Sequence, residues 1–162
     1  REQLDALDKL GIAHEVVPGV SSFLAAAAAM QKEYTLPEVT QTVILTRMEG
    51  RTPVPERERI EELAKHRATM VIFLSVGRIA ELAERLKTAY PETTPVAVVY
   101  KASWPDETIV TGTLADIAEK VQAAGITKTA LVTIGDFLGD SYALSKLYDK
   151  AFTHEYRQGK NA

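Results

Sequence analysis

Hydrophobic and polar residues follow two different patterns along the chain. Short apolar runs, of which "TMVIFLS" at residues 69–75 is the clearest, are typical of strands that are covered on both faces. Segments with apolar residues three and four positions apart, such as "RIAELAERLKTAY" at 78–90, predict amphipathic helices. The predicted strands are residues 14–17, 41–47, 69–75, 94–103, 107–114 and 129–138, and the predicted helices are residues 1–10, 21–31, 55–66, 78–90, 114–125 and 140–152.

The order of these elements indicates the fold class. Strands and helices take turns along most of the chain, and the turn Trp104-Pro105-Asp106 predicts that the strands on either side of it form an antiparallel hairpin or wide turn. We therefore expect an α/β protein whose mixed sheet of about five strands is flanked by helices. The polar residues from Thr153 onward are expected to fray.

Composition narrows the class of protein without identifying a chemistry. With 46% hydrophobic and 25% charged residues, the 162-residue chain resembles an ordinary globular domain. It has no cysteine, which excludes disulfides and thiolate metal sites and suits the cytoplasm. The net charge of −3 is spread along the chain and gives no indication of a nucleic-acid partner. No apolar run reaches the roughly 18 residues that a membrane helix needs, so we expect no membrane partner.

Candidate catalytic groups are sparse. His14, His66 and His154 lie far apart in the sequence, no metal-binding motif occurs, and we expect no metal site. The glutamates within residues 56–62 alternate with arginines, which is typical of a solvated, ion-paired helix face. Methyl transfer from a sulfonium donor is compatible with such a sequence, because the thioether leaves without protonation and the protein mainly aligns the reactants.

The segment "AHEVVPGVSSFLAAAAAM" at residues 13–30 is the most unusual part of the chain. Its helix is made almost wholly of alanine, so another backbone or a flat ligand can approach it closely, and its N-terminus offers N–H donors just after two serines. One interpretation is a ligand site at this helix end. The other is a buried helix packed on the sheet, since alanine is also the best helix former.

Three stretches together resemble the tetrapyrrole methylase family, whose members use S-adenosylmethionine. They are "EVVPGVSS" before the alanine helix, the strand that ends in "IFLS", and "TPVAVVYKASWPDETIVTGTLADI". Residues 41–75, "QTVILTRMEGRTPVPERERIEELAKHRATMVIFLS", resemble the branch that methylates carbon 11 of precorrin-4 or cobalt-precorrin-4 in cobalamin biosynthesis. The resemblance extends from Gly11 to about Gly139.

The resemblance implies particular site residues. Ser21 and Ser22 correspond to the hydroxyl-bearing pair at the methionine end of the cofactor, Leu74 to an apolar position near the end of the third strand, and Ala102 to a small residue whose backbone meets adenine. From the residue types alone, Leu74 could equally be a core residue and Ala102 part of a turn. No catalytic residue is assigned.

A tetrapyrrole that accepts the methyl group would need cationic side chains to bind it. Arg47 and Arg51, in the loop after a strand end, are candidates to bind the carboxylates of a tetrapyrrole, although each could equally be a solvated loop charge.

The resemblance also implies an arrangement of two domains with the cofactor between them, and a homodimer. The family's Gly-Asp-Pro loop is not found in this sequence. We therefore expect residues 1–18 to be the end of a truncated N-terminal domain, 19–152 to be the C-terminal methylase domain, and 153–162 to be a tail. On this view the 162 residues alone are inactive and prone to associate.

Two other functions remain open from the sequence. One is a non-catalytic dimerisation or packing module, in which the alanine helix is only a packing surface. The other is a generic α/β nucleotide-binding enzyme, which the absence of a phosphate-binding loop disfavours.

Overall fold

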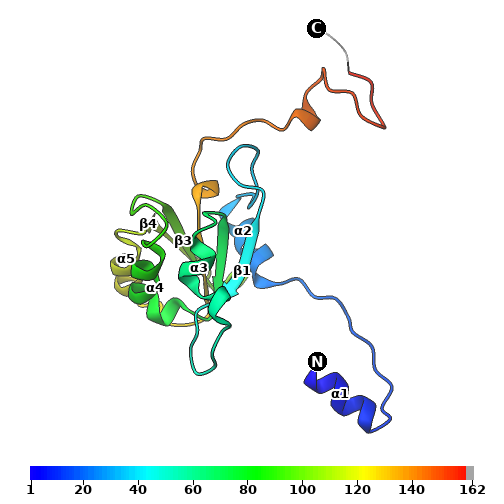
Figure 1. The fold of residues 1–162 in the computed structure, drawn as a ribbon, viewed down its shortest axis with the longest axis vertical. Helices are drawn as coiled ribbons and strands as arrows, with labels where there is room; N and C mark the ends of the chain where they lie inside the picture. Colours follow the sequence, from blue (N-terminus) through cyan, green and yellow to red (C-terminus); the bar gives the residue numbers. More distant parts are fainter. Residues whose placement is uncertain (160–162) are drawn as a thin grey trace.

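A five-stranded mixed sheet organises the chain in the computed structural model, which describes residues 1–159 (Figure 1). The strands are β1 (Val43–Arg47), β2 (Thr69–Phe73), β3 (Pro95–Tyr100), β4 (Thr108–Thr113) and β5 (Ala130–Ile134), in the order β1-β2-β5-β3-β4. β1 and β2 are parallel, and the other three pairs are antiparallel. The predicted α/β class, the mixed sheet and the β3–β4 hairpin are confirmed.

The interior strands are the ones with continuous apolar sequence. The first four residues of β2 and the last four of β5 are buried, as are Val96 to Val99 in β3. Because β5 lies antiparallel between β2 and β3, those two strands run in the same direction and end at the same edge of the sheet.

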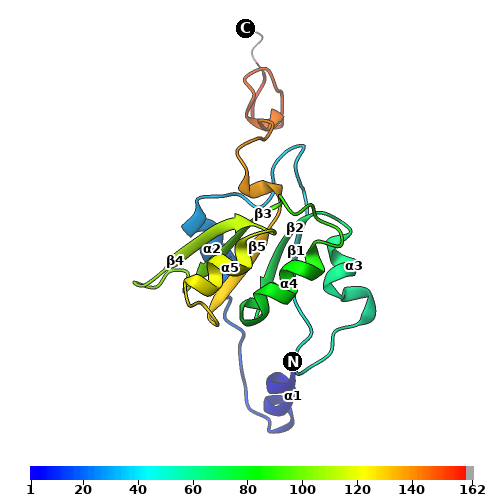
Figure 2. The same ribbon diagram turned by 90° about the vertical axis from the view of Figure 1, so that its left-hand side faces the viewer.

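Three helices cover one face of the sheet. They are α3 (Ile60–Ala64), α4 (Ile79–Leu86) and α5 (Ile117–Ala123), which Figure 2 shows side by side over the strands. Leu82 of α4 and Ile117 of α5 are fully buried in the same cluster as Val98 of the sheet. This face holds the larger part of the core.

The alanine helix, α2 (Ser22–Met30), lies on the opposite face. Ala26 is fully buried there against a cluster that includes Val71 and Leu131. It is the only buried residue of the helix, so the interpretation of α2 as a helix packed on the sheet is confirmed for one stripe. Leu45 and Ile109, on the outer strands, remain substantially exposed, so one helix does not cover the whole face.

Two sequence predictions are wrong, and a third is correct only in part. Residues 14–17 form no strand, because no other strand lies beside them to accept their hydrogen bonds, and Val16 and Val17 are exposed. Residues 140–152 form only a 3-10 turn, η4 (Lys146–Tyr148), since their apolar side chains contact no core and an unpacked helix of this length is marginal. The predicted helix 55–66 is a 3-10 turn, η1 (Glu56–Glu58), followed by α3, whose first residue is also the first to be buried.

The remaining elements are close to their predicted positions. The first helix is α1 (Glu2–Lys9), which buries no residue and lies apart from the sheet at the end of an extended segment (Figure 1). The predicted helix 78–90 corresponds to α4, which the 3-10 turn η2 (Val76–Arg78) precedes, and the predicted strand 129–138 ends in the turn η3 (Asp136–Leu138). No helix within residues 1–159 is long and apolar enough to cross a membrane.

Candidate functional site

A cavity of about 540 Å³ opens at the edge where β2 and β3 end. In α/β proteins ligands bind outside the carboxyl ends of such strands. The lining residues are Ser22, Phe73, Leu74, Val76, Gly77, Arg78, Val99, Lys101, Ala102, Trp104, Thr127, Lys128, Thr129, Ala130 and Leu131. They come from four separate segments of the chain, and we call this cavity the main pocket.

The backbone around the main pocket is held in unusual conformations. Leu74, Lys101 and Thr129 line it with φ angles of 55°, 48° and 56°, in the left-handed region that side chains other than glycine rarely adopt. Ser103, between two lining residues, has a φ of 72°. Strained backbone persists where the surrounding structure enforces it, and it is concentrated at binding sites.

Leu74 shows the effect of this strain on a side chain. Strand β2 stops one residue earlier, and the left-handed turn points the leucine out of the core, where it is 89% exposed. The alternative that Leu74 is a core residue is therefore wrong. Its apolar surface is available at the wall of the pocket.

One side of the pocket is closed by a close backbone approach. A Cβ atom on Gly77 would lie 3.0 Å from the carbonyl oxygen of Thr127. Glycine at this position lets the turn before α4 lie directly against the segment that leads into β5. A side chain here would require the turn or the Thr127 carbonyl to shift by a few tenths of an ångström.

The turn between β3 and β4 forms the outer lip. Trp104 is 57% exposed at the pocket, and the Lys101 ammonium lies 5.3 Å from the centroid of its ring. Lys101 also forms an ion pair with Asp106, which raises the pKa of the lysine and lowers that of the aspartate. The Ser103 amide donates to a carboxylate oxygen of Glu107 at 2.6 Å. These contacts hold the indole in place.

The structure brings three of the four predicted cofactor residues together. Ser22, Leu74 and Ala102 all line the main pocket. Ser21 is the N-cap residue of α2 but is not part of the lining, and its side chain makes no capping hydrogen bond. The N-terminus of α2 and the C-terminal ends of β2 and β3 therefore meet at one site.

Sequence reasoning missed a large part of the pocket. Lys101 and Trp104 were interpreted as parts of a strand and a turn, and Thr129 as the start of a strand. Their sequence signal is weak, because nothing local indicates that β5 inserts between β2 and β3 and brings residues 127–131 to the same edge.

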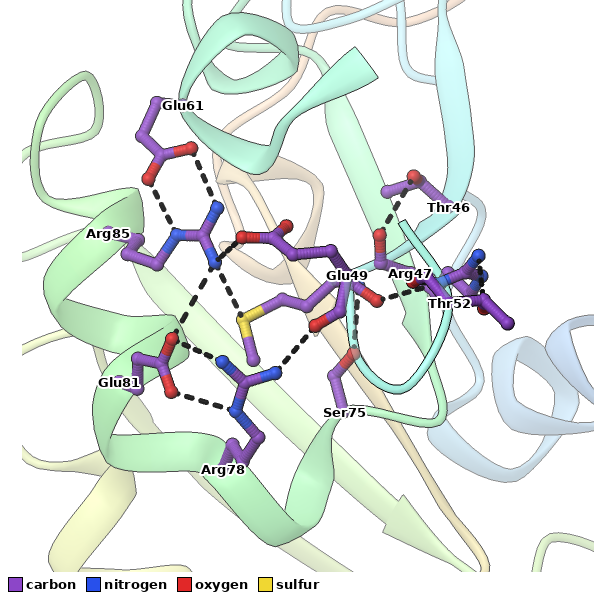
Figure 3. Close-up of polar contacts among 10 residues, drawn as sticks. Thr46, Arg47, Glu49, Thr52, Glu61, Ser75, Arg78, Glu81 and Arg85 are labelled. Carbon is purple, nitrogen blue, oxygen red and sulfur yellow. Dashed lines mark hydrogen bonds and ion pairs between the residues drawn. The ribbon is translucent and has the colours of Figure 1, made fainter. Parts of the chain in front are cut away.

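The predicted acceptor residues lie at the end of β1, which is Arg47, and in the loop that follows it, which contains Arg51. The Arg47 guanidinium donates to the carbonyl oxygens of Met48, Thr52 and Pro53 at 3.1 to 3.3 Å and to the Thr52 hydroxyl at 3.0 Å (Figure 3). Arg47 also lines a second cavity of about 430 Å³, which shares Phe73 with the main pocket. Arg51 is exposed in the same loop. The hydrogen bonds of Arg47 thus fix the conformation of the loop, whereas the exposed Arg51 is available to a ligand.

The lining of the main pocket limits its chemistry. Arg78, Lys101 and Lys128 are its charged residues, and no Asp or Glu is found among the described residues that line it. No group of His, Asp and Glu side chains within residues 1–159 could hold a metal ion. Apolar walls, backbone polar groups and a few hydroxyls suit a flat, polar-edged ligand.

The sequence of the chain is similar to a protein family and to curated relatives of known function. Residues 1–118 match the family model described as Tetrapyrrole (Corrin/Porphyrin) Methylases. The chain is 59% identical over 160 residues to the cobalt-precorrin-4 C(11)-methyltransferase of Methanocaldococcus jannaschii, which covers 98% of this chain and 62% of that protein. The chain thus spans about three fifths of the length of this curated relative.

Solved structures agree with the sequence comparison. The X-ray structure of a cobalt precorrin-4 methyltransferase aligns with a TM-score of 0.82 and 47% identity, over 86% of this chain and 59% of that one. The uroporphyrin-III C-methyltransferase of Thermus thermophilus, complexed with S-adenosylhomocysteine, aligns with a TM-score of 0.68 and 25% identity, over 85% of this chain and 59% of that one. With its fold and most of its length matched in this way, the chain belongs to the tetrapyrrole methylase family.

Proposed function

We propose that this chain is part of an S-adenosylmethionine-dependent methyltransferase that acts on carbon 11 of precorrin-4 or cobalt-precorrin-4 in cobalamin biosynthesis. The observation that carries the proposal is the 59% identity, across nearly the whole chain, to a cobalt-precorrin-4 C(11)-methyltransferase. The main pocket supports it, since Ser22, Leu74 and Ala102 line the same cavity.

The main pocket fits the adenosine part of the cofactor. Its volume of about 540 Å³ is in the usual range for small-ligand sites, roughly 300–1,000 Å³. Ala102 leaves room for a ring beside its backbone, and the apolar side chains of Val99 and Leu131 flank the same space. When bound, the cofactor supplies a methyl group on a positively charged sulfur.

The residues of this chain would bind and orient the cofactor and exclude water. Leu74 and Trp104 offer apolar surface at the pocket wall, and the hydroxyls of Ser21 and Ser22 lie at the N-terminus of α2. The described lining holds no carboxylate that could pair with the amino group of the cofactor. In this proposal, that end of the cofactor is held by a part of the protein outside this chain.

The acceptor would lie on the side of the loop after β1. A tetrapyrrole that carries several carboxylates needs cations, and Arg51 is exposed in that loop while Lys128 lies on the lining of the main pocket. Arg47 contributes indirectly, since its guanidinium is already bonded to loop carbonyls.

The proposal includes the domain organisation and assembly. Residues 1–18 would belong to a preceding domain, residues 19–152 would form the C-terminal domain, and residues 153–162 would be a tail. Exposed Val16 and Val17 support a partner for the first segment. Exposed apolar residues beyond η3, among them Leu144 and Tyr148, support association with a second copy. The cytoplasm is the proposed location.

The test is transfer of a radiolabelled methyl group from S-adenosylmethionine to precorrin-4 and to cobalt-precorrin-4. It uses this chain alone and this chain fused to the part of the Methanocaldococcus jannaschii relative that lies outside the matched region. We expect transfer by the fusion and none by the chain alone. A folded fusion that binds S-adenosylhomocysteine but methylates neither acceptor would refute the proposed substrate. Turnover by the chain alone would refute the need for a further domain.

A further inference from the structure

Three side chains, Ser75, Arg78 and Arg85, hold the loop of residues 48–54 against the segment after β2 and against α4. The Met48 amide donates to the hydroxyl of Ser75 at 3.0 Å, and Ser75 in turn donates to the carbonyl oxygen of Phe73 at 2.7 Å. Arg78 donates to the carbonyl oxygen of Glu49 at 2.6 Å. Arg85 reaches the carboxylate of Glu49, also at 2.6 Å (Figure 3).

Arg85 is the centre of this set of contacts. Its guanidinium holds both carboxylate oxygens of Glu61 at 2.6 and 2.9 Å, and it lies 3.6 Å from a carboxylate oxygen of Glu81. The arginine side chain is only 15% exposed. One side chain of α4 thereby connects α3 to the loop after β1, and Figure 3 shows the Arg85 guanidinium between the carboxylates of Glu61 and Glu49.

The ion pairs around Arg85 are a weak source of folding stability by themselves. Removing charged groups from water costs free energy that an ion pair only partly returns, so a well-packed apolar residue in the place of Arg85 can leave the fold equally stable. Its directed contacts, however, fix a loop geometry that apolar packing cannot fix. One oxygen of Glu49 is buried without a hydrogen-bond partner among the described residues, which is a further cost of this arrangement.

The loop links the two sides of the site. Ser75, which holds its start, directly follows Leu74 at the main pocket, and Pro53 and Val54 at its end line the second cavity. We propose that Arg85 is a positioning residue that acts through Glu49 to hold loop 48–54, and with it Arg51, at the acceptor side of the site. This inference rests on the proposed methyltransferase function.

The first test needs no substrate. Hydrogen exchange of the amides of loop 48–54 is measured in the 162-residue chain for wild type, Arg85→Met, Arg85→Lys and Glu49→Gln. Lys87→Met is the control, because Lys87, the C-cap residue of α4, also pairs with two carboxylates, Glu84 and Glu92, but forms no ion pair with the loop within the described residues. We expect faster exchange in Arg85→Met and Glu49→Gln, partial protection in Arg85→Lys, and no change in Lys87→Met. Wild-type protection in both Arg85→Met and Glu49→Gln would overturn the inference.

The second test is kinetic and uses the fusion described above. We expect Arg85→Met to raise the KM for the tetrapyrrole about tenfold, as the loss of one well-placed charge-assisted hydrogen bond would, with unchanged affinity for S-adenosylhomocysteine. Glu49→Gln should behave similarly if Arg85→Met fails to fold. An unchanged KM in a folded variant, or an equal loss of cofactor affinity, would overturn the positioning role. A wild-type fusion that folds and binds S-adenosylhomocysteine but methylates neither acceptor instead refutes the proposed function.

Discussion

The backbone of Gly77 meets the carbonyl oxygen of Thr127 so closely that a Cβ atom would lie 3.0 Å from that oxygen. This contact joins the turn before α4 to the segment before β5 and closes one side of the main pocket. Neither partner can move away without moving a wall of the pocket. The contact therefore provides a direct test of whether the pocket geometry determines cofactor binding.

Gly77→Ala should weaken binding of S-adenosylhomocysteine while the chain remains folded. The added methyl group overpacks a tight contact, at a cost of about 1–3 kcal/mol, and the backbone shift that relieves it displaces the pocket wall. Titration calorimetry gives the affinity and thermal unfolding gives the stability. Gly50→Ala is the control, because a Cβ there meets nothing within 4 Å. Equal affinity in Gly77→Ala and wild type would mean that the cofactor does not use this wall.

Ala102→Leu should obstruct the same pocket. Ala102 is a lining residue, and close-packed sites have little room for additional methylene groups. We expect a large loss of S-adenosylhomocysteine affinity, with retained secondary structure by circular dichroism. Normal binding by a folded Ala102→Leu variant would show that the predicted adenine contact is wrong.

Replacing Ser21 and Ser22 together by Ala should reduce cofactor affinity. The Ser21 side chain makes no capping hydrogen bond to α2, so its loss should cost the helix little. If both hydroxyls bind the cofactor, about 0.5–1.5 kcal/mol is lost for each. Calorimetry on the single and double variants measures the two contributions. Unchanged cofactor affinity in the double variant would mean that the two serine hydroxyls have only a structural role.

Trp104 is the only tryptophan of the chain, so its fluorescence reports on the pocket directly. The side chain is 57% exposed, and a ligand that covers it should shift the emission to shorter wavelength. Trp104→Phe should keep most of the affinity, and Trp104→Ala should lose about 0.5–1.5 kcal/mol beyond the lost buried area. If calorimetry detects S-adenosylhomocysteine binding while the emission stays unchanged, the ligand does not reach this lip.

The acid stability of the chain should depend on Arg85. Hydrogen bonds from Arg85 lower the pKa of both Glu49 and Glu61 below their ordinary value of 4.5. A carboxylate whose pKa is lowered by folding stabilises the native state above the unfolded value, and this contribution is lost as the pH falls through the lower folded value. Urea unfolding between pH 7 and pH values below 4.5 should therefore show a steeper loss of stability in wild type than in Arg85→Met. Parallel curves for the two proteins would contradict the assignment.

The sequence predicted the sheet well because its signals there are local. The apolar run of β2 and the turn at Trp104-Pro105-Asp106 determine a buried strand and a hairpin without reference to distant residues. The predictions for residues 14–17 and 140–152 were wrong for the opposite reason. Apolar side chains there look like those of a strand or a helix, but only a packing partner would stabilise either one, and none lies beside them within residues 1–159.

The sequence predicted some residues of the site and not others, and the difference has a physical reason. Ser22, Leu74 and Ala102 lie beside elements with strong signals, and the family resemblance supplied their roles. The Arg85 cluster could not be predicted, because its charges alternate along exposed helix faces like any solvated surface. Only the packing of α4 against α3 brings those particular residues together.

The central position of β5 also constrains when the main pocket can form during synthesis. β5 is the last strand of the chain, yet it occupies the gap between β2 and β3. A nascent chain that has not reached Ala130 leaves the facing edges of both strands unpaired and lacks a wall of the pocket. These pairings join residues far apart in sequence, and such pairings are slow to form. Cofactor binding would therefore be acquired in one late step, when the final strand inserts.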